Sequence, residues 1–349
     1  MSGELVEDSV YVKDQKESSQ LYNKGNYGYP MKGGNLELDL AEATYLCECQ
    51  RLTVTYMGKT MTFKDLFNYS ASTVNDFDVK YMVYRDIRSR GFVVKIESGT
   101  FDMSVFPRGM IISNSHPIYM VKAVSERLAF NISIYAEEIS ETENKGRELL
   151  YGVVDEEGDI TYYIMSSVDP IGSIFPSKIR KTTGYLIKDR VFIFDLFSSE
   201  LVKKSGFYGK EIGNILQLSL IETCYLLERG EFLVRSPGTN KEIQLNELLK
   251  FGRDTQDEFD LRMKAYSDAK RRGLVVKTGF KYGTHFRAYD ESPNSCHAKY
   301  LIHAVNARSK TMWPEISRAV RLSSGVKKKF LFCEIGNTVR YIEFKWVRP

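Results

Sequence analysis

Hydrophobic positions recur at helical spacing in two distant parts of the chain. Residues 38–49 and 216–227 each place apolar side chains at the spacing of a 3.6-residue period, which predicts a core-facing helix in each part. A strand pair precedes each of these helices, and a second helical stretch follows at residues 62–67 and 245–251. The same order of elements is therefore expected twice along the chain.

A glycine and a valine-rich run mark the next stage in both parts. A helix is expected to end at Gly91 and another at Gly273, because glycine readily adopts the left-handed conformation that terminates helices. The runs that follow, residues 92–95 and 274–277, favour strands. Each part is thus predicted to continue from a helix into a sheet.

The last part of the chain predicts a helix followed by a strand pair. Pro314 follows Trp313 at a position that suits the first turn of a helix. Strands are expected at residues 329–334 and 340–347, joined by a turn at Gly336. The fold class predicted for each part is α+β, with an N-terminal α/β subdomain and a C-terminal mixed sheet flanked by helices.

The two parts match in sequence as well as in pattern. Gly28 matches Gly209 at an offset of 181 residues (209 − 28), and Gly91 matches Gly273 at an offset of 182 (273 − 91). Other blocks fall into the same register: residues 40–46 with 220–226, 84–95 with 266–277, and 116–124 with 297–305. Matches in register over most of the length indicate a tandem duplication.

The duplication predicts the domain boundaries. A stretch rich in proline, glycine, serine and lysine separates the copies and is interpreted as a linker. The predicted units are a first repeat at 8–170 (subdomains 8–76 and 77–170), a linker at 171–190, and a second repeat at 191–349 (subdomains 191–256 and 257–349).

Composition supports two folded units and excludes several classes of protein. Of 349 residues, 43% are hydrophobic and 27% are charged, with a net charge of +4, which excludes disordered, collagen-like and coiled-coil proteins. No apolar run approaches the roughly 18 residues of a membrane span, and the first residues lack the pattern of a secretory signal. Five cysteines, an odd number, argue against a disulfide framework. We therefore expect a cytoplasmic protein with no membrane partner.

Candidate chemistry concentrates in the second repeat. Three of the four histidines, His285, His297 and His303, lie close together in sequence among tyrosine, arginine and lysine residues. A lone histidine is more often a structural group than a catalyst, but this clustering favours a site. Serine-hydrolase, Walker A, Rossmann and metal-ligand motifs are all missing from the sequence, so hydrolases, NTPases, dehydrogenases and metal centres of those types are excluded.

Three blocks in this region carry a resemblance to a known family. They are residues 279–289 (Gly-Phe-Lys-Tyr-Gly-Thr-His-Phe-Arg-Ala-Tyr), 297–303 (His-Ala-Lys-Tyr-Leu-Ile-His) and 321–328. In this order they resemble the archaeal tRNA-splicing endonuclease family, and the duplication resembles its two-repeat homodimeric class. The resemblance implies nuclease-like C-terminal sheets and cleavage of precursor tRNA at bulge-helix-bulge exon–intron junctions. It also implies metal-independent transphosphorylation without a cofactor, which leaves 2′,3′-cyclic phosphate and 5′-hydroxyl ends.

The resemblance gives three residues a role in this reaction. Tyr289 matches the base for the ribose 2′-hydroxyl, His297 the acid for the 5′-leaving oxygen, and Lys328 the cation beside the phosphate. A histidine pKa of about 6.5 suits an acid at neutral pH, whereas a tyrosine with a pKa of about 10 needs a nearby cation to act as a base. Tyr282 remains an alternative to Tyr289 as the base. The lysines on either side of Lys328, Lys327 above all, remain alternatives for the cation. We expect Tyr289 and His297 on neighbouring strands.

The first repeat lacks part of this set and is expected to be inactive. His116 matches His297, and Arg147 matches Lys328. The ungapped position of Tyr289 is occupied by Arg108, and the nearest aromatic residue is Phe106. Neither a phenylalanine nor a guanidinium can take up a proton here. The sequence therefore predicts one active site per chain.

An acidic turn distinguishes the first repeat. Its members are Asp155, Glu156, Glu157 and Asp159, where the second repeat has residues 334–337. The resemblance implies that this turn docks into a basic pocket on the catalytic unit of the other chain and holds a homodimer together. An ordinary exposed β-turn is the alternative.

Arginines of the second repeat are candidates for RNA contacts. By the match, Arg321 clamps a flipped-out base, and Arg348 is the second candidate, with Lys345 as its rival; planar guanidinium groups stack on unpaired bases. A solvent-facing arginine is the alternative for both. Two other functions stay open: a non-catalytic RNA-binding or assembly subunit, and a metal-dependent nuclease, whose paired carboxylates are missing from the sequence.

Overall fold

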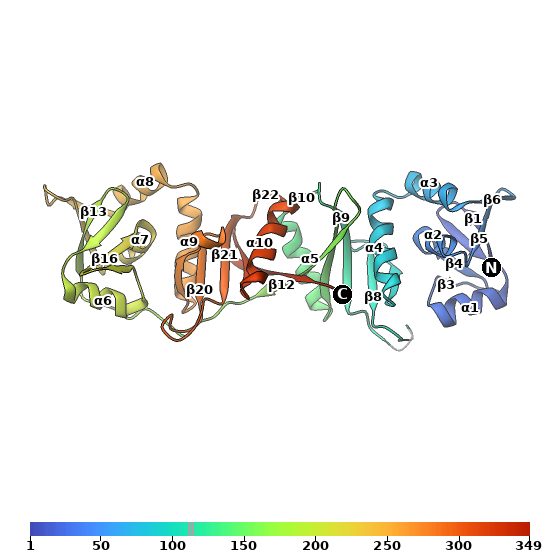
Figure 1. Cartoon of the computed structure of the whole chain (residues 1–349), viewed down its shortest axis with the longest axis horizontal. Helices are drawn as coiled ribbons and strands as arrows, with labels where there is room; N and C mark the ends of the chain where they lie inside the picture. The colour runs from blue at the N-terminus through green and yellow to red at the C-terminus, as the bar shows by residue number, and fades with distance from the viewer. Residues whose placement is uncertain (111, 113–114) are drawn as a thin grey trace.

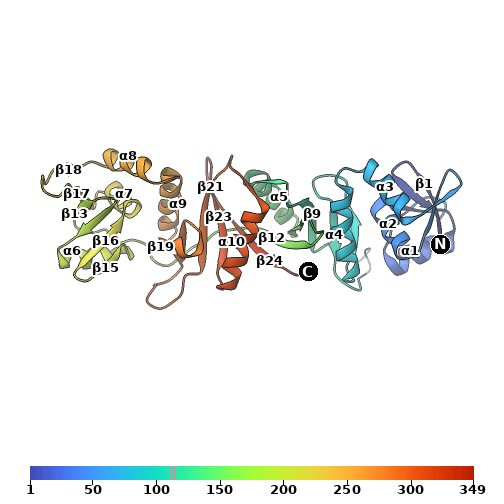
Figure 2. The same ribbon diagram turned by 45° about the horizontal axis from the view of Figure 1, so that its top comes forward.

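The protein is an elongated molecule in which two similar halves meet in the middle (Figure 1). The structure, a computed structural model, describes residues 1–110, 112 and 115–349. The N-terminal subdomains form the two ends, and the C-terminal subdomains lie side by side at the centre, as the rotated view in Figure 2 also shows. The tandem α+β duplication expected from the sequence is confirmed.

Each N-terminal subdomain is a six-stranded sheet packed against three helices. In the first repeat the sheet order is β3 (Tyr29–Pro30), β4 (Leu36–Asp39), β2 (Ser9–Val12), β1 (Ser2–Val6), β5 (Thr53–Tyr56) and β6 (Lys59–Met61), with helices α1 (Gln15–Gly25), α2 (Leu40–Glu48) and α3 (Phe63–Thr73). In the second repeat it is β15 (Lys210–Ile212), β16 (Ile215–Ser219), β14 (Arg190–Ile193), β13 (Thr182–Ile187), β17 (Phe232–Arg235) and β18 (Glu242–Ile243), with helices α6 (Leu196–Gly206), α7 (Leu220–Glu228) and α8 (Leu245–Thr255).

Two strands extend past the boundaries that the sequence suggested. Strand β1 lies ahead of residue 8, and strand β13 lies inside the stretch 171–190. Both are hydrogen-bonded into their sheets, β1 parallel to β5 and β13 parallel to β17. The composition of 171–190 indicated a linker throughout, but within this stretch the structure leaves only residues 171–181 and the turn at 188–189 without helix or strand.

The two C-terminal subdomains form one ten-stranded sheet. Its order is β19 (Val275–Thr278), β20 (Phe286–Tyr289), β21 (Tyr300–Asn306), β23 (Lys329–Ile335), β24 (Val339–Val347), β12 (Ile160–Val168), β11 (Glu148–Val154), β9 (Tyr119–Ser125), β8 (Met103–Phe106) and β7 (Val93–Ile96). Strands β24 and β12, one from each repeat, pair antiparallel at the centre. The strand order is therefore mirrored about this central pair.

Helices cover both faces of the central sheet. Helices α4 (Phe77–Ser89) and α9 (Phe259–Arg271) pack on one face, and helices α5 (Ile132–Asn144) and α10 (Trp313–Gly325) pack on the other. Strands β10 (Ala129–Asn131) and β22 (Lys310–Met312) form a small second sheet between the repeats. The 3₁₀ helix η2 (Phe280–Tyr282) precedes β20.

Local sequence signals explain where the helices begin and end. Asp39 and Ser219 accept backbone hydrogen bonds in capping boxes at the starts of α2 and α7. Gly91 and Gly273 follow α4 and α9 with φ angles of +88° and +77°, a conformation that favours glycine. The predicted ends of these two helices are confirmed.

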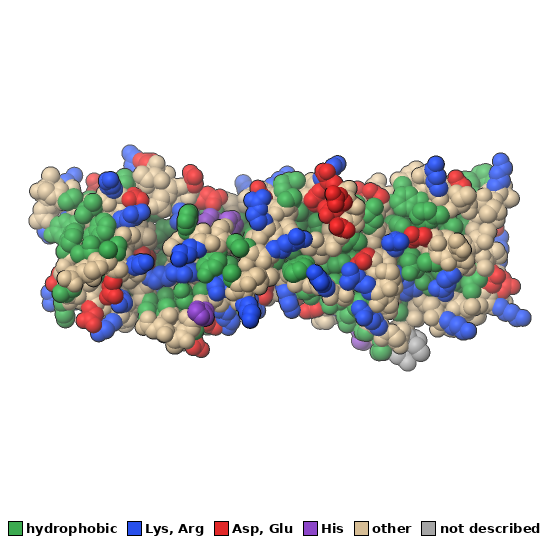
Figure 3. Space-filling model, in the orientation of Figure 1, with side chains coloured by type: hydrophobic (Ala, Val, Ile, Leu, Met, Phe, Trp, Pro, Cys, Tyr) green, Lys and Arg blue, Asp and Glu red, His purple; other side chains and the backbone are tan. Residues whose placement is uncertain are grey.

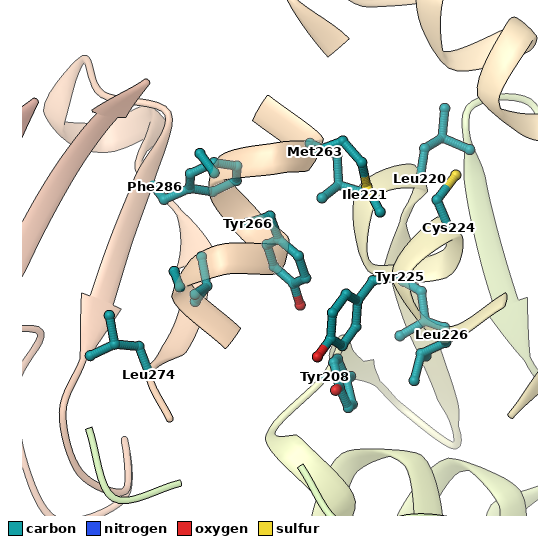
Figure 4. Packing of buried hydrophobic residues seen from close by; sticks show 14 of the residues in the cluster. Tyr208, Leu220, Ile221, Cys224, Tyr225, Leu226, Met263, Tyr266, Leu274 and Phe286 are labelled. Atoms are coloured by element: carbon teal, nitrogen blue, oxygen red, sulfur yellow. The ribbon is translucent and has the colours of Figure 1, made fainter. Parts of the chain in front are cut away.

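Buried aromatic side chains join the subdomains and the repeats. Figure 4 shows the core between α7 and α9, where the rings of Tyr225 and Tyr266 meet edge to face with centroids 5.6 Å apart. At the centre of the molecule, Trp313 is 1% exposed and contacts the rings of Phe130 and Tyr163 from the first repeat. The central core thus belongs to both repeats.

Candidate active site

Three neighbouring strands of the second repeat meet at one edge of the central sheet, and the predicted catalytic residues lie at their ends. Strand β20 ends at Tyr289 and runs antiparallel to β21, which begins three residues after His297. Strand β23 is parallel to β21 and begins directly after Lys328. Backbone hydrogen bonds of 3.0 and 2.9 Å join Lys299 to both neighbouring strands. The topology therefore brings the three backbone positions together.

Tyr289 is held in a small apolar cluster. It is 9% exposed and packs with Val275 and Ala298, and Ile174, Phe207 and Cys296 pack against this cluster. Ile174 comes from the segment between the repeats and Phe207 from the N-terminal subdomain. Parts of three structural units thus fix the orientation of this ring.

The segment that carries Ile174 is bound to the sheet by its backbone. The N–H of Gly172 donates to the Arg272 carbonyl at 2.9 Å, and the N–H of Ser173 donates to the Asp290 carbonyl at 2.8 Å. A Cβ on Gly172 would lie 2.3 Å from the carbonyl oxygen of Gly273, so only glycine fits at this crossing. Sequence reasoning missed this strap, although glycine in the stretch was a signal.

The turn after α10 gives three consecutive lysines different surroundings. Lys327 has a φ of +54° and is the left-handed residue that ends the helix. The ammonium of Lys329 pairs with Glu343 at 2.8 Å. Lys328 is half-buried, and its ammonium lies 5.8 Å from the centroid of the Tyr282 ring. Of the three, Lys328 combines partial burial with freedom from a carboxylate partner in the described part of the chain.

Tyr282 lies ahead of strand β20, whereas Tyr289 is the last residue of that strand. It belongs to η2 and packs against the core beneath α10. Its ring makes a cation–π contact with Lys328. The residue considered as an alternative base is therefore a neighbour of the lysine.

The histidines do not assemble as the sequence suggested. His297 is exposed in the loop between β20 and β21. It is not on a strand, because the pairing of β21 with β20 begins only at Tyr300. His285 and His303 are cross-strand neighbours whose rings stack 4.3 Å apart. Burial lowers the pKa of His285 to about 3. Two of the three clustered histidines are thus half-buried and stacked on each other rather than placed beside Tyr289.

The register of the first repeat corrects one match. Val93 pairs with Phe106 as Val275 pairs with Tyr289, so Phe106 and not Arg108 is the structural counterpart of the tyrosine. The ungapped match misses Phe106 by two residues, because the offset between the repeats is 182 at this strand (275 − 93) and the β-hairpin of the second repeat is one residue longer. The remaining counterparts keep their places: His116 is exposed three residues before β9, and the Arg147 guanidinium lies 3.4 Å from the sulfur of Met120.

Two arginines lie at the central strand pair. Arg321 on α10 donates to the Thr161 hydroxyl at 3.2 Å, and Arg348 directly follows Val347, the last residue of β24, which pairs with Tyr162 of β12. The Arg348 guanidinium lies 5.3 Å from the ring centroid of Trp346. Lys345 points to the other face of β24, because side chains alternate along a strand. The structure thus brings Arg321 and Arg348 to the same end of this strand pair.

The acidic turn joins β11 to β12, and its side chains are exposed, on a part of the surface where Figure 3 shows acidic groups gathered. The Asp155 carboxylate accepts the backbone N–H groups of Glu157 and Asp159, and Glu156 pairs with Arg127 at 2.7 Å. Within the described part of the chain, the carboxylates of Glu157 and Asp159 have no hydrogen-bond or ion-pair partner. Two acidic groups are therefore free to meet another surface.

A basic pocket of about 360 Å³ lies between the subdomains of the second repeat. Its charged lining residues are Arg190, Lys210, Arg262, Lys277 and Arg287 against Asp189 and Glu222. The Nε atoms of Arg262 and Arg287 are buried without a hydrogen-bond partner among the described residues. In the first repeat the residue matching Lys210 is Tyr29, whose hydroxyl donates to the Ile96 carbonyl and bridges the same gap.

Comparisons with known proteins find one family over both repeats. The sequence model of the tRNA intron endonuclease, catalytic C-terminal domain, matches residues 77–162 and 259–341, and that of the tRNA intron endonuclease, N-terminal domain, matches residues 1–67 and 182–249. The chain is 35% identical over 340 residues to a tRNA-splicing endonuclease of Methanococcoides burtonii, covering 95% of each chain. It is 34% identical to that of Methanosarcina mazei, covering 95% of this chain and 94% of the relative, and 27% identical to that of Halobacterium salinarum over the full length of both.

Proposed function

Because the chain belongs to the tRNA intron endonuclease family, we propose that it cleaves precursor tRNA at bulge-helix-bulge exon–intron junctions by metal-independent transphosphorylation. It is an enzyme of tRNA splicing, and the proposal concerns its junctions and mechanism. The second repeat carries the chemistry, and the first supports it. The observation that carries the proposal is the meeting of Tyr289, His297 and the lysine turn at one sheet edge of the second repeat only.

In the proposed reaction one P–O bond forms and another breaks at the same phosphorus. Tyr289 takes the proton of the ribose 2′-hydroxyl, and the 2′-oxygen attacks the adjacent phosphorus. The bond to the 5′-oxygen breaks, and His297 gives that oxygen its proton, so the products are a 2′,3′-cyclic phosphate and a 5′-hydroxyl. Lys328 stabilises the charge that develops on the phosphorane, the kind of term that is often the largest in such reactions.

The experiment that tests this mechanism is cleavage of a bulge-helix-bulge RNA in EDTA, with the product ends identified. We expect undiminished cleavage and 2′,3′-cyclic phosphate ends. Loss of cleavage on chelation would favour a metal-dependent nuclease. Tight binding without any cleavage would favour the non-catalytic subunit.

The duplication provides a matched control for the acid. Replacing His297→Ala should lower the cleavage rate by about 10²- to 10⁴-fold, the usual contribution of a general acid, and leave RNA binding intact. His116→Ala removes the equivalent imidazole of the first repeat and should leave the rate unchanged. Equal effects of the two substitutions would refute the assignment to one repeat.

The two arginines at the central strand pair are proposed to clamp an unpaired base. Arg321 contacts Thr161 of β12, and Arg348 follows β24 at the same end of the strand pair; planar guanidinium groups stack on flipped-out bases. Replacing either arginine by alanine should weaken binding of bulge-containing RNA more than binding of a continuous duplex. Equal binding by the wild type and both variants would oppose the clamp.

We also propose that the acidic turn of one chain docks into the basic pocket of a second chain. The free carboxylates of Glu157 and Asp159 and the unpartnered guanidinium nitrogens of Arg262 and Arg287 are complementary in charge. The described part of each chain holds one such turn and one such pocket, so a symmetric homodimer satisfies both. Asp155 shapes the turn, and Glu156 adds negative charge to its surface.

Charge reversal tests this docking. Replacing the four acids at 155–159 by serine should yield monomers with little activity in sedimentation and cleavage assays. Converting Glu157 and Asp159 to lysine should also give monomers, and adding Arg190→Glu and Lys210→Glu should restore dimers. A fully dimeric and active serine variant would rule the docking out.

A further inference from the structure

The outer face of the N-terminal sheet in the second repeat carries a row of aromatic and basic side chains. In the register of this sheet Arg235 lies beside Tyr185, and Tyr185 lies opposite Phe192. Paired residues point to the same face of a sheet, and the alternate residues of β14, Val191 and Ile193, are fully buried on the other face. The row is therefore a solvent-side feature.

Exposed phenylalanines extend this row at one side. Phe194 is 53% exposed and Phe197 is 68% exposed. The ring of Phe194 lies 6.0 Å from that of Tyr185 and is nearly parallel to that of Phe192 at 6.4 Å, centroid to centroid. Figure 3 shows hydrophobic side chains gathered over this end of the molecule. Large aromatic groups left in water in this number mark an interaction surface.

A cavity of about 420 Å³ opens beside these rings. Tyr185, Phe194 and Phe197 line it, and Arg180 and Lys181 contribute the positive charge. The one carboxylate in its lining, Asp195, accepts the backbone N–H of Ser198 and caps α6. The cavity thus combines aromatic walls with cationic side chains.

The first repeat shows that the fold does not require this face. The residue matching Tyr185 is Glu4, which pairs with Lys13 at the position of Phe194. Farther along the same row Tyr11 donates to Glu37, whose counterpart in the second repeat is Gln217. The equivalent surface of the first repeat is polar and carries two carboxylates, so the aromatic and basic face belongs to one copy only.

We propose that this face binds unpaired nucleotides of the precursor RNA outside the cleavage junction, an inference that rests on the proposed function. Bases would stack on Tyr185, Phe194 and Phe197, and phosphates would contact Arg180 and Lys181. Aromatic platforms flanked by cations are the usual means of binding single-stranded nucleic acid without sequence preference. An apolar protein partner would explain the exposed rings but not the two cations. On the equivalent face of the first repeat, the carboxylates would repel phosphate, so RNA would not bind there.

The test compares the binding of two RNAs in the slowly cleaving His297→Ala background. Phe194→Ser with Phe197→Ser should weaken binding of an intron-containing precursor tRNA transcript by about tenfold, the effect of losing one stacked base. Binding of a minimal bulge-helix-bulge duplex, which has no further unpaired segments, should be unchanged. The matched control is Lys13→Ser with Lys16→Ser at the same positions of the first repeat, which should affect neither RNA beyond about twofold.

Two outcomes would overturn the proposal. The first is unchanged affinity of the phenylalanine variant for the precursor transcript. The second is conversion of the variant to monomers in sedimentation, which would assign the face to a second copy of the chain. Because all substituted side chains are exposed, circular dichroism should show an intact fold. If this face does not bind RNA, cleavage of the minimal duplex is unaffected, and the proposed mechanism still stands.

Discussion

At the scale of single residues, three consecutive lysines show how surroundings separate groups that sequence alone cannot. Lys327 ends a helix, Lys329 is paired with Glu343, and Lys328 lies over the ring of Tyr282. Only Lys328 is both held in place and unpaired with a carboxylate in the described part of the chain. This arrangement favours it as the charge-stabilising group.

We predict that Lys328→Met lowers the cleavage rate by about 10²- to 10³-fold, the usual effect of removing one donor that stabilises a transition state. Lys327→Met and Lys329→Met should each change the rate by less than about fivefold. Single-turnover rates with saturating enzyme measure the difference. A larger loss in Lys327→Met than in Lys328→Met would place the catalytic ammonium one residue earlier.

A second lysine is buried where the first repeat has an arginine. Lys270 is fully buried, donates to the Gly206 carbonyl at 2.9 Å and lies 4.7 Å from the Tyr208 ring centroid. Arg88 makes the equivalent contacts in the first repeat, with Gly25 at 2.7 Å. Burial lowers the pKa of Lys270 to about 7, with help from the nearby Lys277.

This lowered pKa predicts a pH-dependent stability. Between about pH 7 and about pH 10 the unfolded chain binds a proton on Lys270 that the folded chain does not, so the free energy of unfolding should rise with pH by up to about 1.4 kcal/mol per unit. Lys270→Arg keeps the contacts seen at Arg88 but does not titrate, and it should remove this slope. Urea unfolding at several pH values measures it, and equal slopes in both proteins would contradict the lowered pKa.

At the scale of elements, the sequence predicted best what depends on local signals. The helices ending at Gly91 and Gly273 and the strands at 92–95 and 274–277 depend on helix stops and β-branched runs, and the structure has them there. Contacts between distant segments left no such signal. The strap at Gly172 looked like linker, because its hydrogen bonds go to residues about a hundred positions away.

We predict that Gly172→Ala lowers cleavage by about tenfold or more. A Cβ there would meet the Gly273 carbonyl oxygen at 2.3 Å, so the strap must shift and take Ile174 away from Tyr289. Small displacements of a catalytic group have effects of this size. Gly336→Ala is the control, since its Cβ would lie at an ordinary 3.5 Å from Ala307. Equal activity of both variants would show that the strap does not position the tyrosine.

At the scale of the whole molecule, the duplication was visible in the sequence, but the union of the copies was not. Matching blocks indicate two repeats, yet nothing in one repeat shows that β12 and β24 pair or that α5 and α10 cover one core. The pairing depends on backbone edges, which all strands have. A core built from both copies implies that neither central subdomain is stable without the other.

This union predicts that one core substitution destabilises both repeats. Trp313 belongs to the second repeat but packs on Phe130, Tyr135 and Tyr151 of the first. Trp313→Ala should therefore cost about 3–5 kcal/mol and should speed hydrogen exchange in β11 and β12 as much as in β23 and β24. Trp346→Ala, which truncates a tryptophan 37% exposed on β24, is the matched control and should do neither. Faster exchange confined to the second repeat would mean that the two halves of the sheet open independently, and the fused core would then be an association of two stable domains.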